Sequence, residues 1–328
     1  MEENILYILT GFVAMIAGGF WGLGGGWYIV PALLLLKVDH HVATTASLIQ
    51  MVGSTCFTVG RQFRSIGWSN KDDVGYAVAL PLCGMALVGG YFGRFINKPA
   101  SMIWQVSEIK SIVFMVLILW IFWKSLTAKK QDFSLETPFK ARPFLVSVTG
   151  FLTGMTSAFL GIGGGTVNRP VLSNVLKLHE TETGKICRLA VFVTALSGTV
   201  SNLTANGLDK TAEALTQAAG CFSGSAQATS GEAQSIIIAL FIIIGGAVGY
   251  PLGSYIHSEV VKTGNAYKVT KSFAYIALLV LTGLICKLTG HDTFGQVALV
   301  VCGVIIAIYL FTMLFKARKL NKRAAKQA

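Results

Sequence analysis

The sequence is short of charged residues. Only 13% of its 328 residues are charged, against about 25% in typical soluble proteins, and acidic residues number 15 against 27 basic ones. Hydrophobic residues make up 53% and come in long blocks, several of them long enough to cross a hydrocarbon core of about 30 Å. This composition excludes a soluble domain and predicts a polytopic protein embedded in a lipid bilayer.

Several motifs of enzymes and pumps are also missing. The chain has no HExxH sequence, no Gly-Lys-Ser/Thr after a glycine run, no membrane-embedded Asp/Glu pair and no CxxC spacing among its six cysteines. We therefore expect no catalytic residues, no metal, no cofactor and no ATP-driven pump. The formal net charge is +12, and the lysine and arginine residues that carry it lie between the apolar blocks and at the C-terminus, where cytoplasmic loops of membrane proteins have them. We therefore expect no nucleic-acid partner.

The apolar blocks predict an all-α membrane protein with eleven helical segments. Two of these, 27–37 and 166–178, are shorter than about 20 Å and cannot span alone, and each follows three consecutive glycines. We expect both to be the returning arms of broken hairpins. The predicted segments are 5–22, 27–37, 41–60, 74–96, 109–125, 143–161, 166–178, 185–205, 234–256, 270–289 and 295–316.

Matched residues show that the two halves of the chain repeat each other. Four matches share a separation of 139 residues: Gly11 with Gly150, Gly22-Leu-Gly-Gly-Gly26 with Gly161-Ile-Gly-Gly-Gly165, Pro31 with Pro170, and His40 with His179. Later matches drift to larger separations: Gly53 with Gly198, and then Gly89 and Gly93 with Gly249 and Gly253. Residue order is kept, which indicates two homologous halves.

The distribution of lysine and arginine predicts the sidedness of the segments. Counting spans from a cytoplasmic C-terminus places the N-terminus outside and gives the two halves opposite topology, as in many secondary transporters. Each repeat is then a broken helical hairpin plus three spanning helices. The predicted parts are a first repeat (1–125), a cytoplasmic linker (126–142), a second repeat (143–290) with an extracytoplasmic insertion (206–233), an extra span (291–316) and a basic cytoplasmic tail (317–328).

The two glycine runs are candidate anion-binding turns. We expect the returning helices to begin just after Gly24-Gly25-Gly26 and Gly163-Gly164-Gly165, with Pro31 and Pro170 in their first turns. Each helix start offers unpaired N–H groups and about half a positive charge, so two starts that meet near the bilayer midplane would form an anion cradle. The alternative is that the glycines only permit close helix packing.

Arg169 is the most informative single residue. It follows Asn168 just after the second glycine turn, about 14 Å from the end of its segment, which is near the middle of the membrane. A charge there must face a polar cavity or a partner, and the neighbouring apolar segments contain no carboxylate. An anionic substrate held by Asn168 and Arg169 fits this requirement; snorkelling or bonding to helix-end carbonyls is the alternative.

Polar side chains in the spans after the hairpins are further candidates for the substrate site. Hydroxyls and amides suit a desolvated oxyanion, although bonding between helices is an equally good reading for any one of them. The two histidines at the ends of the short helices could couple transport to protons, or could simply cap helix ends. The candidates are Ser47, Gln50, Ser54, Thr194 and Ser197 for substrate and His40 and His179 for protons.

The doubled motif Gly22-Leu-Gly-Gly-Gly-Trp-Tyr-Ile-Val-Pro31 and Gly161-Ile-Gly-Gly-Gly-Thr-Val-Asn-Arg-Pro170 resembles that of the sulfite exporter TauE/SafE family of membrane transporters. The stretch Val42-Ala-Thr-Thr-Ala-Ser-Leu48 also looks like the family's Ala-Thr-Ser-rich segment. The resemblance implies transport of sulfite, sulfonates or related compounds across the cytoplasmic membrane of a prokaryote, driven by an ion gradient and without a cofactor. Asn168-Arg169 departs from the apolar pair that is usual in the family before this proline.

The sequence therefore predicts a secondary transporter of a small anion, a sulfur oxyanion or organosulfonate, that works by alternating access around a midplane site. An anion channel and a non-transporting membrane assembly or sensor protein are the alternatives. The expected partners are the small anionic substrate, the lipid bilayer and a coupling ion such as the proton. The expected location is the cytoplasmic membrane, and the sequence does not give an oligomeric state.

Overall fold

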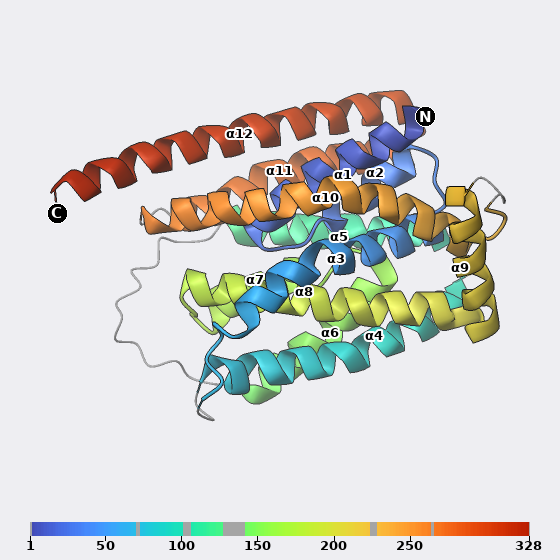
Figure 1. Cartoon of the computed structure of the whole chain (residues 1–328), viewed down its shortest axis with the longest axis horizontal. Coiled ribbons are helices and arrows are strands. Elements are labelled where there is room, and N and C mark those ends of the chain that lie inside the picture. Colours follow the sequence, from blue (N-terminus) through green and yellow to red (C-terminus); the bar gives the residue numbers. More distant parts are fainter. Residues whose placement is uncertain are drawn as a thin grey trace.

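The computed structural model describes residues 2–69, 73–100, 106–126, 142–223, 228–263 and 266–327. This part of the chain is almost entirely helical and contains no strand. Seven of its helices are long and apolar enough to cross a membrane, and the long helices run side by side (Figure 1). The chain is thus a multi-pass helical membrane protein.

The first half contains one broken hairpin and the helices that follow it. Helix α1 (Glu2–Trp21) is followed by the short α2 (Gly26–Leu35), and then by α3 (His40–Phe63). A π-helical turn (Gly75–Ala79) leads into α4 (Leu80–Ala100), and α5 (Val106–Leu126) ends the half. Most of the predicted linker 126–142 lies outside the described residues.

The second half repeats this order of elements. The hairpin consists of α6 (Pro143–Leu160) and α7 (Gly165–Pro170), which continues as a π-helix (Val171–Val175). The spans are α8 (Glu180–Leu203), α10 (Gly231–Lys262) and α11 (Ala266–Leu288), and α12 (Asp292–Gln327) closes the chain. Every one of the eleven predicted segments is therefore confirmed as helical.

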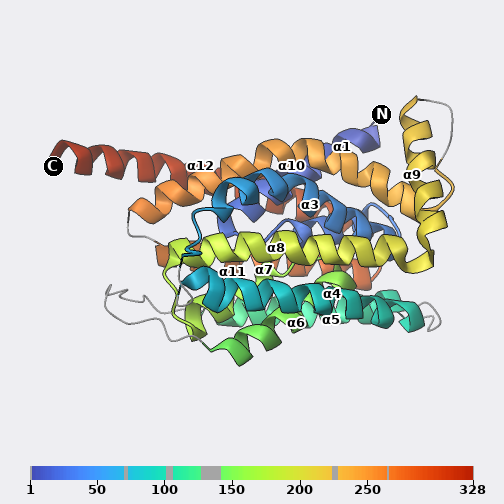
Figure 2. The ribbon, with the colours of Figure 1, turned by 60° about the horizontal axis from the view of Figure 1, so that its bottom comes forward.

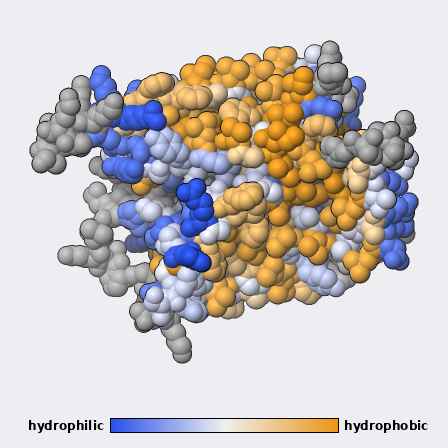
Figure 3. Space-filling view, in the orientation of Figure 1, coloured by the Kyte–Doolittle hydropathy of each residue, from blue (hydrophilic) through white to orange (hydrophobic). Residues whose placement is uncertain are grey.

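One further helix, α9 (Leu208–Ser223), lies in the polar insertion 206–233, for which the sequence analysis predicted no structure. It stands across the ends of the long helices near the N-terminus, while the C-terminus lies at the opposite end (Figures 1 and 2). Ala214 and Ala218 on its buried side pack against Ala233 and Ile236 of α10. On the face drawn in Figure 3, a broad hydrophobic band separates two more hydrophilic ends.

Glycine contacts show that the repeat extends to tertiary packing. A methyl group on Gly11 of α1 would collide with the carbonyl oxygen of Ile242 in α10, and one on Gly150 of α6 would collide with that of Leu82 in α4. Each hairpin thus packs closely against the second spanning helix of the other half, α10 for the first hairpin and α4 for the second. Gly89 and Gly249 make the equivalent contacts, with the carbonyl oxygens of Phe151 and Phe12, and this agreement supports their pairing in the repeat.

Three details of the predicted repeat are wrong. The π-helix Val171–Val175 adds one residue to the second half, so the start of α8 is 140 residues after that of α3, not 139. Helices α3 and α8 both have 24 residues, so Gly198 corresponds to Thr58 and not to Gly53. His40 and His179 also do not end the short helices: His40 begins α3, and His179 is the N-cap residue of α8.

The prolines lie later in the short helices than predicted. Helices α2 and α7 begin at the third glycine of each run, which places Pro31 and Pro170 sixth and not in the first turn. Proline has no N–H to donate to the carbonyl four residues earlier, so the helical ladder is interrupted there. In the second half the chain continues as a π-helix directly after Pro170.

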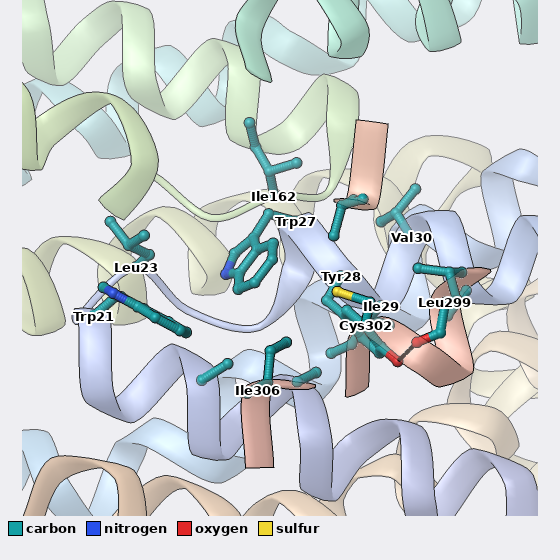
Figure 4. Close-up of a cluster of buried hydrophobic side chains, with 14 of the residues drawn as sticks. Trp21, Leu23, Trp27, Tyr28, Ile29, Val30, Ile162, Leu299, Cys302 and Ile306 are labelled. Atoms are coloured by element: carbon teal, nitrogen blue, oxygen red, sulfur yellow. Dashed lines mark hydrogen bonds between the residues drawn. The ribbon is translucent and has the colours of Figure 1, made fainter. Parts of the chain in front are cut away.

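The short helix α2 is held firmly by buried aromatic residues. Trp27 packs beside Trp21 and Ile162, and the Tyr28 hydroxyl donates a 3.0 Å hydrogen bond to the carbonyl of Leu299 in α12 (Figure 4). The Trp21 indole N–H donates to the carbonyl of Val269 in α11 at 2.8 Å. These bonds fix the first glycine turn against the last two helices.

Candidate functional site

The two glycine turns meet inside the protein. Gly26 is so close to the second turn that a methyl group on it would collide with the carbonyl oxygen of Gly161, and one on Gly165 would lie 2.7 Å from the Cα atom of Leu23. The turns also share a backbone conformation, because Gly22 and Gly24 have φ values of 67° and 77°, matched by 71° and 69° at Gly161 and Gly163. Such left-handed values favour glycine, so the motif is required for this geometry.

Two matched side chains close over the turns. Met51 of α3 and Val191 of α8 are both fully buried and occupy equivalent positions 140 residues apart. The sulfur of Met51 and a methyl group of Val191 would each lie 2.9 Å from a methyl group on Gly24, and the Met51 sulfur would lie 2.8 Å from one on Gly163. The centre of the site is therefore packed shut in this conformation.

The predicted hydroxyl and amide residues play different parts. Thr194 accepts a 2.9 Å hydrogen bond from the N–H of Gly164, and Ser47 donates one of 2.8 Å to the carbonyl of Gly161, so both support the second turn. Gln50 donates to Ser54 within α3, and this pair faces Gly246 of α10. Ser197 donates to the carbonyl of Leu87, which ties α8 to α4 and leaves its hydroxyl engaged away from the turns.

Arg169 lies between the two halves of the site. It is only 5% exposed, and its Nη1 atom would lie 3.5 Å from a methyl group on Gly22, so a guanidinium carried by the second half reaches the turn of the first. The neighbouring Asn168 is completely buried, and neither polar atom of its side-chain amide has a hydrogen-bond partner. Position 30, which corresponds to Arg169 in the first half, holds Val30.

An open cavity of about 660 Å³ lies beside this region, between the C-terminal parts of α3 and α10 and the start of α8. Its lining contains three cationic side chains, those of Lys185, Arg188 and Lys262, and no carboxylate. Arg188 and His257, both 5% exposed, line it, and Nη2 of Arg188 and Nε2 of His257 would lie 3.7 and 3.6 Å from a methyl group on Gly184. The full lining is Gln62, Ser65, His179, Thr181, Lys185, Arg188, Ser254, Tyr255, His257, Ser258, Val261 and Lys262.

The sequence analysis missed both Arg188 and His257. Arg188 stands inside the predicted apolar segment 185–205, where a charge is itself a signal of function, but it lies near the segment end, where snorkelling is common. His257 falls one residue past the predicted end of 234–256, whereas α10 continues to Lys262. The longer helix is what places this imidazole in the cavity wall.

The rim of the cavity is tied to the last helix. Arg318 of α12 donates a 3.1 Å hydrogen bond to the hydroxyl of Tyr255, and Asn321 donates to the Glu259 carboxylate at 3.0 Å. Glu259 also pairs with Lys262 at 2.7 Å. The end of α10 and the long α12 are therefore joined at this rim.

The structure does not bring His40 and His179 together. His179 lines the open cavity together with Gln62, and its ring accepts a 3.3 Å hydrogen bond from the N–H of Thr181, which is a capping role. His40 is 22 residues from Gln62 along α3, about 33 Å away, and its Nδ1 atom is 3.2 Å from the Thr44 hydroxyl. The two histidines thus lie at opposite ends of the molecule.

Comparison with known proteins identifies what this arrangement resembles. The model of the sulfite exporter TauE/SafE family matches residues 7–280. A probable membrane transporter protein of Methanocaldococcus jannaschii is 26% identical over 61% of this chain and 73% of its own length. Probable membrane transporter proteins of Xylella fastidiosa and Haemophilus influenzae are 28% and 24% identical, over 39% and 52% of this chain.

The chain spans about half of the Xylella relative, 47%, and 62% of the Haemophilus one. No solved structure matches the chain. Within the described residues, no cluster of His, Cys, Asp and Glu could hold a metal ion.

Proposed function

Because this chain belongs to the sulfite exporter TauE/SafE family and is a membrane transporter, we propose that it carries a small anion, a sulfur oxyanion or an organosulfonate, by alternating access. The substrate site lies where the two glycine turns meet, and Asn168 and Arg169 are its main ligands. The protein resides in the cytoplasmic membrane with its N-terminus outside and its C-terminus inside.

One observation carries the proposal: a buried arginine stands at the contact of two broken hairpins, next to a cavity lined by further basic groups. A guanidinium presents a rigid fork of donors that matches the oxygens of sulfite, sulfonate or carboxylate groups. The basic cavity attracts anions and repels cations before they reach that point. The charge pattern thus favours anionic cargo.

The arrangement of the halves supports an inverted repeat. The start of α8 lines the same cavity as Gln62, which is about 33 Å along α3 from the start of that helix. Equivalent points in the chain, the starts of α3 and α8, therefore lie at opposite ends of the helices. Each hairpin packs against the other half through matched glycines, as described above. Two such halves can exchange their conformations, which opens the central site first to one side and then to the other.

The conformation described here corresponds to one stage of that cycle. The cavity beside Arg188 is open, whereas Met51 and Val191 pack against the glycine turns. An anion that binds to the turns must displace these two side chains, and both lie on helices that cross at the centre.

Counterflow in proteoliposomes tests the function. Proteoliposomes that contain the purified protein and are loaded with unlabelled substrate should accumulate labelled sulfite, thiosulfate, isethionate or sulfoacetate against a gradient. Acetate and lactate serve as non-sulfur controls. Rapid flux that never exceeds equilibrium would instead establish an anion channel. Absence of flux and of any ligand-induced thermal shift across the panel would favour an assembly or sensor protein.

A further inference from the structure

The open cavity contains a second set of buried groups that the proposed central site does not use. Arg188 is 95% buried in the wall between α8 and α10, and one of its guanidinium nitrogens, Nη1, donates a 3.1 Å hydrogen bond to the side-chain oxygen of Gln62. Its Nε atom is buried without a hydrogen-bond partner. One donor of this guanidinium is therefore buried and unpaired.

His257 adds a second buried polar group to the same wall. It is 5% exposed, packs edge-on against Phe20, and its Nδ1 atom has no hydrogen-bond partner. It lies close to Arg188, since both side chains approach Gly184. Arg188 Nε and His257 Nδ1 are thus two buried polar atoms without partners in one wall, an arrangement that costs stability unless another group satisfies them.

The surroundings favour an anionic ligand. The cavity lining contains Lys185, Arg188 and Lys262 but no carboxylate. Lys185 and Lys262 are paired with Glu182 and Glu259, whose carboxylates stand outside the lining. Arg188 is the buried cation of the cavity, and Gln62 holds its side chain in place, so little rotamer freedom remains to be lost on binding.

We propose that Arg188, with His257 beside it, forms an outer anion-binding subsite that receives the oxyanion group of the substrate before Arg169 does. This inference rests on the proposed function for the chemical class of the cargo. The cavity volume of about 660 Å³ leaves room for an organic tail beyond the oxyanion group. The subsite therefore accommodates organosulfonates as well as the smaller sulfite ion.

The two subsites lie along one route. Gly22, whose missing side chain leaves space beside Arg169, is also near the carbonyl oxygen of Gly184, and Gly184 in turn lies beside Arg188 and His257. Two arginines in succession allow an anion to move inward without crossing an uncharged stretch. Occupancy must stay weak enough for release at each step.

Direct binding of isethionate and sulfite to the full chain in zwitterionic nanodiscs tests the proposal, and the lipid choice removes anionic headgroups as competitors. Arg188→Gln should weaken binding by about tenfold or more, because charge-assisted bonds are lost. Arg61→Gln is the matched control, since Arg61 is exposed near the same end of α3 and outside the cavity lining. It should bind as the unchanged protein does.

Further variants keep the test decisive. Arg188→Lys retains the positive charge but loses the planar set of donors of the guanidinium, so it should weaken binding severalfold. This variant replaces Arg188→Gln in the test if Arg188→Gln does not fold. Arg169→Gln should stop counterflow while the outer subsite still binds. Unchanged affinity in both Arg188 variants, or binding of no anion by the unchanged protein, would overturn the outer subsite.

The same data separate this inference from the proposed function. If no sulfur compound binds but acetate or phosphate does so through Arg188, the proposed cargo is wrong and the outer subsite stands. If the Arg188→Gln variant transports sulfonates at the normal rate and with an unchanged half-saturation concentration, the proposal of an outer subsite is wrong and the proposed function stands.

Discussion

The two glycine turns have nearly the same backbone and very different surroundings. Their φ values agree within about 10°, yet the first is bordered by Val30 and Leu48 where the second has Arg169 and Arg188. The first turn is anchored by aromatic residues, and the second by the Thr194 hydroxyl. The repeat thus supplies a shared scaffold, and one half supplies the charge.

Removing the charge from the second half should have the largest effect. Arg169→Val makes the halves alike at this position and should reduce anion counterflow at least 100-fold, equivalent to about 2.7 kcal/mol. Thermal stability should be kept or raised, because a buried charge is replaced by an apolar group. Counterflow in proteoliposomes and thermal unfolding in nanodiscs are the measurements. Counterflow within twofold of the unchanged protein would remove Arg169 from the site.

Adding a side chain at the contact of the turns should have the next largest effect. Gly26→Ala forces a methyl group against the second turn and should destabilise the protein by about 1–3 kcal/mol. Gly60→Ala is the control, because Gly60 is an exposed α3 residue with open space around its Cα atom. Unfolding in urea compares the two. Equal stability of both variants would mean that the turns are not in contact.

The difference in anchoring can be tested with smaller changes. Thr194→Val leaves the N–H of Gly164 without its partner and should cost about 1–2 kcal/mol. Ser54→Ala at the equivalent position of α3 removes only a bond from Gln50 and should cost less than half as much. Thermal unfolding of the two proteins gives the comparison. A larger loss for Ser54→Ala would contradict the assigned asymmetry.

The smallest effect is expected at Ser197. Its bond to the carbonyl of Leu87 joins two helices away from the turns, and such bonds in membranes contribute about 0.6 kcal/mol. Ser197→Ala should therefore lower stability slightly and leave the half-saturation concentration for counterflow unchanged. A marked rise in that concentration would place Ser197 in the substrate site after all.

The sequence predicted the helices and the repeat because long apolar blocks and glycine runs act locally. Gly22 and Gly161 identify both turns by themselves, since few other residues adopt their φ values. The insertion helix α9 escaped prediction because its 16 residues do not form an apolar block. The single extra residue of the π-helix after Pro170 also gave no signal in the sequence.

The site was only partly predictable for a different reason. Arg169 stood out because no neighbouring segment offered a carboxylate, but the cavity wall depends on the packing of α3, α8 and α10. Arg188 and Gln62 are 126 residues apart in sequence and meet through a hydrogen bond that no spacing rule describes. Tertiary packing therefore determined which polar residues face the cavity and which, like Ser197, join helices.

The bonds from Arg318 and Asn321 to the end of α10 have a practical consequence. Because Arg318 and Asn321 of α12 bond to the wall of the open cavity, any displacement of that wall during turnover must also move the C-terminal part of α12. A spin label on the exposed Lys319 would report such motion from well outside the substrate path. A bulky fusion partner at the C-terminus would for the same reason interfere with the cycle, and affinity tags belong at the other end.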